Sequence, residues 1–523
     1  MTNAGFLLKS LAKDGVTLLC VDGVRRTFKV YALFFTGDIP AVSPLAGHLG
    51  HNAIRPCRIC EIVDTMPFQL DQHTITPKHL PVLSATNTRP LQDYYQGNEA
   101  TSMVKTDTAS VPFYDGPFFF GLDELHLIGM GLCQSLFKLL GGSFDVAGFD
   151  KGPFSLEPDW KDQLTKDLDK SRMKINLDDF EGSFRIPWSK YTTRAVDWID
   201  LVRYAVPALV IPSLTDAVAA NAFLSMVRFV QRTQCRQLDD FDLEEMDSDL
   251  LVWNTYLQQT FNESRINRTF LTPNHHYLNH VTRSIRHLGP MCSYSTRSME
   301  RSIGNLKRLI RSNKDSGMKS NVATASLYRL NKEERNGVLK DEKTANVMVD
   351  MAALAYIDQR RGVGSGLNMD DDNDWDTRLG KTRITQLTHE WPEELRKDDS
   401  IQGFLFGAST SFDQSRKLTR KCYMFNPENS RTVYFGDVHM YVQTEDNLYA
   451  CTTLYKTRQS TVNNMVYLHE HSAQRTRLLP VKWIKQTVSK MESKHDSYTY
   501  FFWQGMISTP HLAGPTLDDI RKL

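Results

Sequence analysis

The amino-acid sequence predicts a mixed α+β protein with a largely helical middle and a small β-rich domain near its C-terminus. Residues 27–35 are rich in β-branched and aromatic side chains and become apolar on both faces, which is typical of a strand inside a sheet. Apolar residues recur at three- and four-residue spacing in 195–235 and 239–261, which is the spacing of helices. Short strand patterns alternate with turns in 420–485, which favours a small barrel or sandwich.

The composition is that of a globular protein and excludes several classes. With 523 residues, the chain is long enough for about three domains. Its formal net charge of +1 excludes a strongly basic nucleic-acid coat protein and an acidic chaperone, although a local basic face remains compatible with it. Eight cysteines are too few for a disulfide-stapled secreted domain. The sequence shows no signal peptide and no apolar run of the roughly 18 residues that span a bilayer, so we expect an intracellular protein with no membrane partner.

The remaining elements follow from local patterns. The expected elements, in chain order, are helical turns at 7–13, strands at 16–21 and 27–35, an irregular region at 43–114, and helices at 123–140, 195–235, 239–261, 274–288 and 298–312. The turn pair Asp22-Gly23 closes the first strand, and Pro207 and Pro212 interrupt the long apolar helix. Residues 361–380 are rich in Gly, Asp and Asn, which is a linker composition.

Asp38 is the first residue that could carry chemistry. It follows the predicted strand 27–35 at its carboxyl end, where open α/β sheets place their active sites. Gly37 permits close backbone approach, and Pro40 stiffens the exit from the turn. Taken alone, Asp38 fits better as a turn residue that caps the next segment.

Cys57-Arg58-Ile59-Cys60 has the spacing of half a zinc site. The chain contains no second Cys-x-x-Cys, so the other ligands must be His or Asp from elsewhere. Asp123 and His126 lie three residues apart on one predicted helical face and are candidates; His48 and His51 are nearer in the sequence. A redox pair or two packed thiols is the alternative.

A basic segment surrounds Glu300. Residues 281–320 contain nine Lys or Arg and only two acids, Glu300 and Asp315. Such a carboxylate among cations suits a metal ion beside a phosphodiester backbone. The candidates for DNA contacts are Arg297, Arg301, Lys307, Arg308 and Arg311. The alternative is an exposed helix on which Glu300 pairs with Arg297 or Arg301.

Several motifs occur in a recognisable order. They are Gly-Asp-x-Pro-Ala, Gly-His-x-Ala, Pro-Cys-x-x-Cys, Asp-x-x-His, Pro-x-x-His-Tyr-Leu-x-His, Gly-Pro and Glu-Arg-x-x-Gly-x-Leu-Lys. Over residues 1–330, this order resembles CACTA-type (En/Spm-like) DNA transposases, most closely their fungal branches; the β-rich tail resembles them more loosely.

The resemblance implies a ribonuclease H-like core with an Asp-Asp-Glu/Asp triad that binds two divalent ions, Mg²⁺ or Mn²⁺, and is interrupted by a long insertion. Asp38 then matches the second acid and Glu300 the third. Cys57 and Cys60 match the family's Cys-x-x-Cys, and Asp123 and His126 match its downstream Asp-x-x-His. His280 matches a recurrent position to which we assign no role.

The chain departs from this family at its start. Only 37 residues precede Asp38, and they lack the three upstream strands and the first acid. Asp14 and Asp22 lie in predicted turns and do not replace it. Asp38 and Glu300 alone would hold one Mg²⁺ loosely at best, because two-metal catalysis needs a bridging carboxylate.

We therefore expect a transposase-derived protein, truncated at its N-terminus and catalytically incomplete, with a structural Zn²⁺, DNA as its partner, a possible homo-oligomeric state and a nuclear location. A domesticated, non-catalytic, zinc-stabilised DNA- or chromatin-binding protein is the alternative, and a zinc-stabilised scaffold without nucleic acid is the third. The expected regions are 1–42 (partial ribonuclease H-like core), 43–270 (insertion), 271–360 (return to the core), 361–400 (linker) and 401–510 (β-rich domain).

Overall fold

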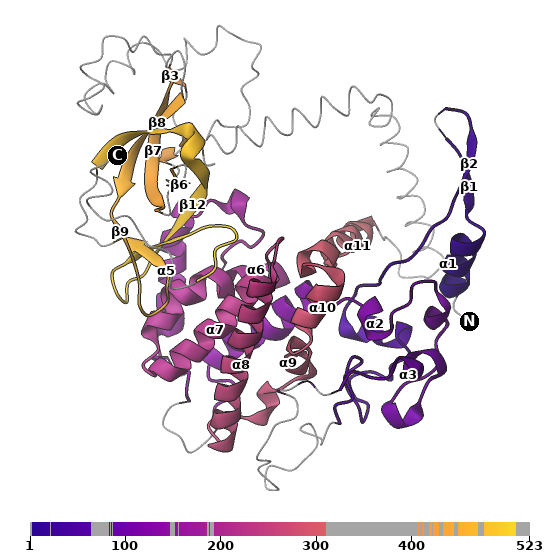
Figure 1. The fold of residues 1–523 in the computed structure, drawn as a ribbon. Coiled ribbons are helices and arrows are strands. Elements are labelled where there is room, and N and C mark those ends of the chain that lie inside the picture. Colours follow the sequence, from indigo (N-terminus) through magenta and orange to yellow (C-terminus); the bar gives the residue numbers. More distant parts are fainter. Residues whose placement is uncertain are drawn as a thin grey trace. The chain divides into compact units, whose positions relative to one another are not determined.

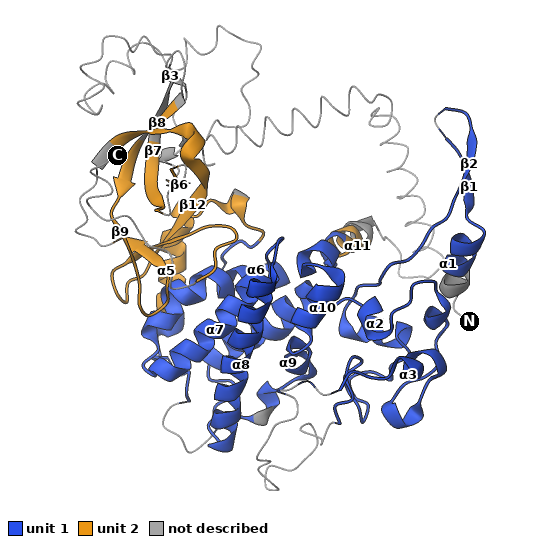
Figure 2. Cartoon of the chain, viewed as in Figure 1, with its two compact units in different colours: residues 1–161, 182–298 blue, residues 162–181, 299–523 orange. Residues whose placement is uncertain are grey.

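In the computed structural model, the described residues are mainly helical in the first part of the chain and form an antiparallel sheet in the last part (Figure 1). They are 3–309, except 21, 64–82, 84, 86, 147–151, 155, 186–187 and 189–192, together with 405–406, 410–412, 418–420, 422–427, 432–443, 448–468 and 475–508. The mixed α+β class is thus confirmed, whereas the expected linker at 361–400 lies outside the described residues. The chain divides into two compact units, residues 1–161 with 182–298 (unit 1) and residues 162–181 with 299–523 (unit 2) (Figure 2).

Unit 1 holds a short hairpin and most of the helices. Its elements are α1 (Asn3–Lys13), β1 (Val16–Leu19), β2 (Arg25–Phe28), α2 (Ile39–Leu45), α3 (Leu91–Gln96), α4 (Gln134–Leu140), α6 (Ala195–Asp200), α7 (Ala217–Thr233), α8 (Asp240–Asn262), α9 (Pro273–Leu278) and α10 (Val281–Leu288). Two further helices cross the boundary between the units in the sequence, α5 (Trp160–Ser171) and α11 (Arg297–Leu309).

The helices expected from apolar periodicity are present. The predicted helix at 123–140 is a π-helix, Leu125–Cys133, that continues into α4. The long apolar stretch forms α6, a buried π-helix at Leu201–Val210 that contains Pro207, and then α7. The interruption predicted at Pro212 is confirmed, since the helical run ends at the single turn Ile211–Ser213 before α7, whereas at Pro207 the chain stays helical as a π-helix. Two of these helices begin at an aspartate side-chain cap: Asp216 caps α7, and Asp239 caps α8.

The buried strand expected at 27–35 is wrong. β2 ends at Phe28 and, among the described residues, pairs with β1 alone, in the antiparallel register Val16↔Phe28 to Leu19↔Arg25. All four β2 residues are exposed, because no further described strand covers either face of this hairpin. Downstream, Phe35 makes an isolated parallel bridge to Phe120.

Unit 2 contains an antiparallel sheet that confirms the expected β-rich C-terminal region. Its strands are β3 (Leu405–Phe406), β4 (Thr410–Phe412), β5 (Leu418–Arg420), β6 (Cys422–Phe425), β7 (Tyr434–Gln443), β8 (Leu448–Tyr455), β9 (Thr457–Gln459), β10 (Val466–Leu468), β11 (Arg475–Pro480), β12 (Ile484–Glu492) and β13 (Thr499–Phe502). The main sheet has the order β11-β8-β7-β6-β12-β13-β10-β9 with β3 beside β7, and β4 pairs with β5 apart from it. We call the main sheet the half-barrel. One side of it covers a core that includes Tyr423, Phe425, Val438, Ala450 and Leu454.

Among the described residues, we find no helix that combines the length and the apolar character required to cross a membrane.

Candidate metal centre

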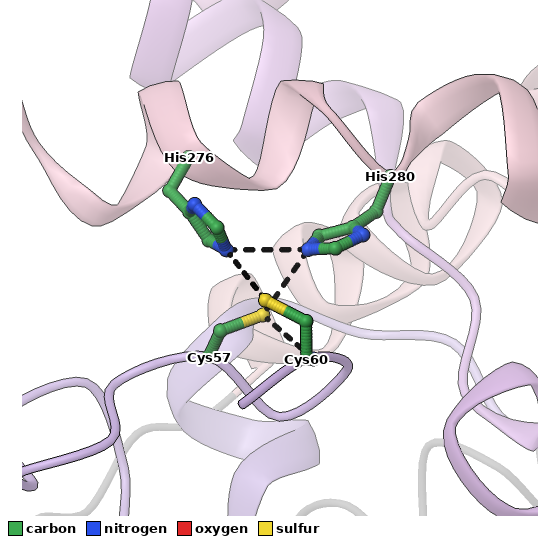
Figure 3. A group of neighbouring side chains, drawn as sticks. All are labelled: Cys57, Cys60, His276 and His280. Atoms are coloured by element: carbon green, nitrogen blue, oxygen red, sulfur yellow. Dashed lines mark hydrogen bonds between the residues drawn. The ribbon is translucent and has the colours of Figure 1, made fainter. Parts of the chain in front are cut away.

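Four metal-ligating side chains from two distant parts of the chain meet inside unit 1. They are Cys57, Cys60, His276 and His280, and their potential ligand atoms all lie within 4.8 Å of one another. All four side chains are buried. Figure 3 shows the two imidazoles pointing from the helical segment toward the two sulfur atoms on the facing loop.

The two cysteines lie on a tight turn that brings their sulfur atoms to one side. The backbone N–H groups of Ile59 and Cys60 both donate to Cys57 Sγ, at 3.3 and 3.4 Å. Arg89 holds the outer side of the turn, because its Nε donates to the Cys57 carbonyl at 2.8 Å and its backbone N–H to the Ile59 carbonyl at 3.0 Å. These hydrogen bonds therefore hold the turn between Cys57 and Cys60.

The two histidines lie at i and i+4 across the junction of α9 and α10. α9 ends at Leu278, yet Asn279 and His280 keep right-handed helical backbone angles (φ −66° and −109°). Helical spacing is thus maintained across the junction, and it places both imidazoles on one side of the segment. His275, the neighbour of His276, instead packs against Phe270 at 4.4 Å between ring centroids.

The separations fit a tetrahedral zinc ion. Cys57 Sγ lies 3.4 Å from His280 Nε2, Cys60 Sγ lies 3.2 Å from His276 Nε2, and the two Nε2 atoms are 3.2 Å apart. Ligands about 2.3 Å (sulfur) and 2.0–2.1 Å (nitrogen) from one tetrahedral zinc ion would stand roughly 3.3–3.8 Å from each other. Four protein ligands fill the coordination sphere, which is the arrangement of a structural rather than a catalytic zinc site.

The four side chains and their burial shift the pKa values within the group in different directions. A hydrogen bond with Cys57 is the main reason that the pKa of Cys60 lies far below its usual value, and bonds with His276 and His280 lower it further. Burial raises the pKa of Cys57 and lowers the pKa of His280. Because zinc binds thiolates and neutral imidazoles, binding here would displace the proton that burial favours on Cys57.

A layer of hydrogen bonds around the group joins the cysteine turn to α9. The Arg58 backbone N–H donates to the hydroxyl of Tyr277, at 3.0 Å, and Tyr277 lies on α9 next to His276. The buried Arg58 guanidinium donates to the carbonyls of Phe120 and Gly121, both at 3.1 Å. The hydroxyl of Tyr94 donates to the Arg58 carbonyl. These contacts join the two halves of the group.

Asp123 and His126, expected to complete the zinc site with Cys57 and Cys60, are not among the four side chains that lie together. Asp123 is buried, and its Oδ2 accepts hydrogen bonds from the Nδ1 of His126 at 2.6 Å and from its backbone N–H at 3.0 Å. The other oxygen accepts the backbone N–H of Thr296 at 2.8 Å. Asp123 thus caps the π-helix and holds the start of α11. The histidines that lie beside the two cysteines are His276 and His280.

The sequence contained a signal for the two missed ligands. His276 and His280 have the His-x-x-x-His spacing that zinc sites use with a Cys-x-x-Cys pair. The other candidates, His48 and His51, lie outside the group of four. His48 is buried and bonds to the Arg55 carbonyl through Nε2 at 2.9 Å.

The two candidate catalytic acids have ordinary local surroundings. Asp38 is the N-cap of α2, and its Oδ1 accepts the backbone N–H of Ala41 at 2.7 Å. Glu300 is exposed in the first turn of α11. The two residues belong to different units, and their catalytic roles stay predictions.

The expected DNA-binding residues fall into three groups. Arg297 is engaged inside unit 1, where its Nε lies 2.6 Å from Glu124 Oε1 and its Nη2 donates to Gln234 at 2.8 Å. Arg301 and Lys307 are exposed on α11. The side chain of Arg308 and the whole of Arg311 lie outside the described residues.

The sequence matches no protein-family model, and it matches none of the curated proteins.

Proposed function

We propose that this chain is a transposase-derived DNA-binding protein of a cut-and-paste element, with an incomplete ribonuclease H-like core and an insertion closed by structural zinc. The order of sequence motifs supports the ancestry. The observation that carries the proposal is the place of the Cys/His group in the chain. Cys57 comes 19 residues after Asp38, and Glu300 comes 20 residues after His280 (57 − 38 and 300 − 280). The group thus joins the segment after one candidate acid to the segment before the other.

Zinc in this group would act on folding. Cys57, Cys60, His276 and His280 would hold it, and it would supply a four-ligand crosslink between the two ends of the insertion. The chain's own residues align the ligands through the Arg58–Tyr277 and Arg89 contacts.

DNA binding in the nucleus would use the exposed basic side chains of α11. We expect the double variant Arg301→Ala/Lys307→Ala to lower the slope of log affinity against log salt by about two units, since each phosphate contact contributes close to one. Fluorescence anisotropy with duplex DNA between low and moderate salt measures this slope. Lys138→Ala is the matched control, because Lys138 is exposed in unit 1 on another helix. An unchanged slope in the double variant would mean that Arg301 and Lys307 do not contact DNA phosphates.

Strand cleavage is not expected from this chain alone. One ion must activate the nucleophile and a second, about 3.5–4 Å away, must stabilise the leaving oxygen, and a carboxylate normally bridges the two. We expect no cleavage or strand transfer of element-end DNA by the purified protein with Mg²⁺ or Mn²⁺. Activity that Asp38→Asn abolishes would contradict this expectation and would show that the first acid is present elsewhere in the chain.

A domesticated, non-catalytic, DNA- or chromatin-binding protein is the second candidate. The hydrogen bond from the Ala41 backbone N–H to Asp38 favours this second candidate, because it gives the carboxylate a structural role as the N-cap of α2. Genomic DNA upstream of the coding sequence separates the two candidates. Flanking terminal inverted repeats indicate an element, and their absence indicates a domesticated gene.

A further inference from the structure

One segment of the insertion packs on the C-terminal half-barrel. Residues 162–181 lie in the sequence between two parts of unit 1, yet they form one compact unit with residues 299–523 (Figure 2). The segment comprises most of α5 followed by single helical turns at Arg172–Lys174 and Leu177–Asp179. Its buried residues are Leu164, Asp167, Leu168, Ser171 and Ile175, which recur at helical spacing along one face.

Three hydrogen bonds join residues 162–181 to successive positions of β12. The Ser171 hydroxyl accepts the backbone N–H of Glu492 at 2.9 Å. The backbone N–H of Asn176 donates to the hydroxyl of Ser489 at 2.9 Å. Thr487 donates to the carboxylate of Asp179. Thr487 and Ser489 lie on the same face of β12, because side chains of a strand alternate. The segment therefore runs along one face of this strand.

Further contacts fix both ends of the segment. Near its start, Asp167 accepts the backbone N–H of Lys494 at 3.2 Å. At its end, Phe180 packs against Phe502 of β13 with ring centroids 5.4 Å apart. The ammonium group of Lys170 lies 2.6 Å from Glu492, and Lys174 also pairs with Glu492. These two lysines are largely exposed, so the buried side chains and the hydroxyl contacts provide the specificity.

We infer that residues 162–181 are an internal ligand of the half-barrel, docked on β12 and β13. The surface of β12 and β13 binds a short amphipathic helix and the residues that follow it. The polar contacts come from the buried hydroxyl of Ser171 and the carboxylates of Asp167 and Asp179. Phe180 supplies the apolar contact at the end of the segment. The bonded residues are 308 to 327 positions apart in the chain. Docking therefore closes a long loop and holds the half-barrel to the insertion independently of the connection through residues 310–400.

Cutting that connection in the full-length protein tests the inference. A recognition site for a sequence-specific protease is inserted between residues 361 and 380, the folded protein is cleaved, and the products are separated by gel filtration. We expect the two fragments to elute together from the otherwise unchanged chain at micromolar concentration. In the Leu168→Asp variant, which places a charge on the docked face, we expect them to separate after cleavage. Lys166→Asp changes an exposed position of the same helix and should leave the fragments together.

Two outcomes overturn the inference: fragments of the unchanged chain that separate after cleavage, or fragments of Leu168→Asp that remain together as firmly as the unchanged ones. Circular dichroism before cleavage shows whether Leu168→Asp is folded. If Leu168→Asp is not folded, the milder double variant Ser171→Ala/Ser489→Ala tests the docking in its place, because it removes only two hydroxyl acceptors. Its cleaved fragments should separate at a lower urea concentration than those of the unchanged chain, and an equal concentration contradicts the docking.

Discussion

Replacing Cys57 and Cys60 by serine should remove zinc from the chain and unfold the region around α9 and α10. The purified protein should carry about one zinc ion per chain, as a single four-ligand site requires, and the double variant close to none. Because the ligands come together only in the folded chain, the binding free energy becomes folding free energy, and structural zinc contributes about 10–16 kcal/mol in zinc-finger peptides. Metal analysis and thermal unfolding measure the two effects.

The double variant His276→Ala/His280→Ala should also lose zinc and stability. This result would distinguish a site completed by His276 and His280 from the one completed by Asp123 and His126 that the sequence suggested. His126→Ala is the matched control: His126 is partly exposed and bonds to Asp123 rather than to a cysteine. It should keep its zinc. If His126→Ala loses zinc while His276→Ala/His280→Ala retains it, the Cys/His group is not the zinc site.

Arg297→Ala should destabilise the protein by about 3–5 kcal/mol, because it leaves a buried carboxylate without its partner. Glu124 is fully buried; its Oε2 accepts a hydrogen bond from Arg297 Nη2 at 2.9 Å, and its Oε1 lies 2.6 Å from Arg297 Nε in the same ion pair. Urea unfolding measures the loss. Lys307→Ala, an exposed change on the same helix, should stay within about 0.5 kcal/mol.

The double variant Glu124→Leu/Arg297→Met is a second control for this ion pair. It replaces both charged partners by apolar side chains, so it should lower the free energy of unfolding much less than Arg297→Ala alone. An Arg297→Ala protein with normal stability but a reduced salt slope of DNA binding would mean that Arg297 contacts DNA, as the sequence suggested.

The helices could be predicted because their signals are local. The apolar spacing of 195–235 and the prolines within it determine where α6, the π-helix and α7 lie. The apolar run at 27–35 carried an equally strong strand signal. It failed because burial of a strand depends on neighbouring strands, and in the part of the chain that the structure describes β2 has no partner but β1.

Half of the Cys/His group could be predicted for the same reason. The Cys57–Cys60 spacing is local, whereas their partners are 216 and 223 positions away and are selected by the packing of Tyr277 on the cysteine turn. Asp123 and His126 have plausible spacing too, but the backbone of Thr296 and the helix start use that carboxylate. The docking of residues 162–181 on β12 has no local signal, since every contact joins residues more than 300 positions apart.

X-ray absorption at the zinc edge of the purified full-length protein tests the central claim most directly. A zinc ion held by Cys57, Cys60, His276 and His280 predicts two sulfur ligands at about 2.3 Å and two nitrogen ligands at about 2.0–2.1 Å. Protein purified without zinc, or a first shell with a carboxylate oxygen in place of a histidine nitrogen, would contradict the claim that this Cys/His group closes the insertion.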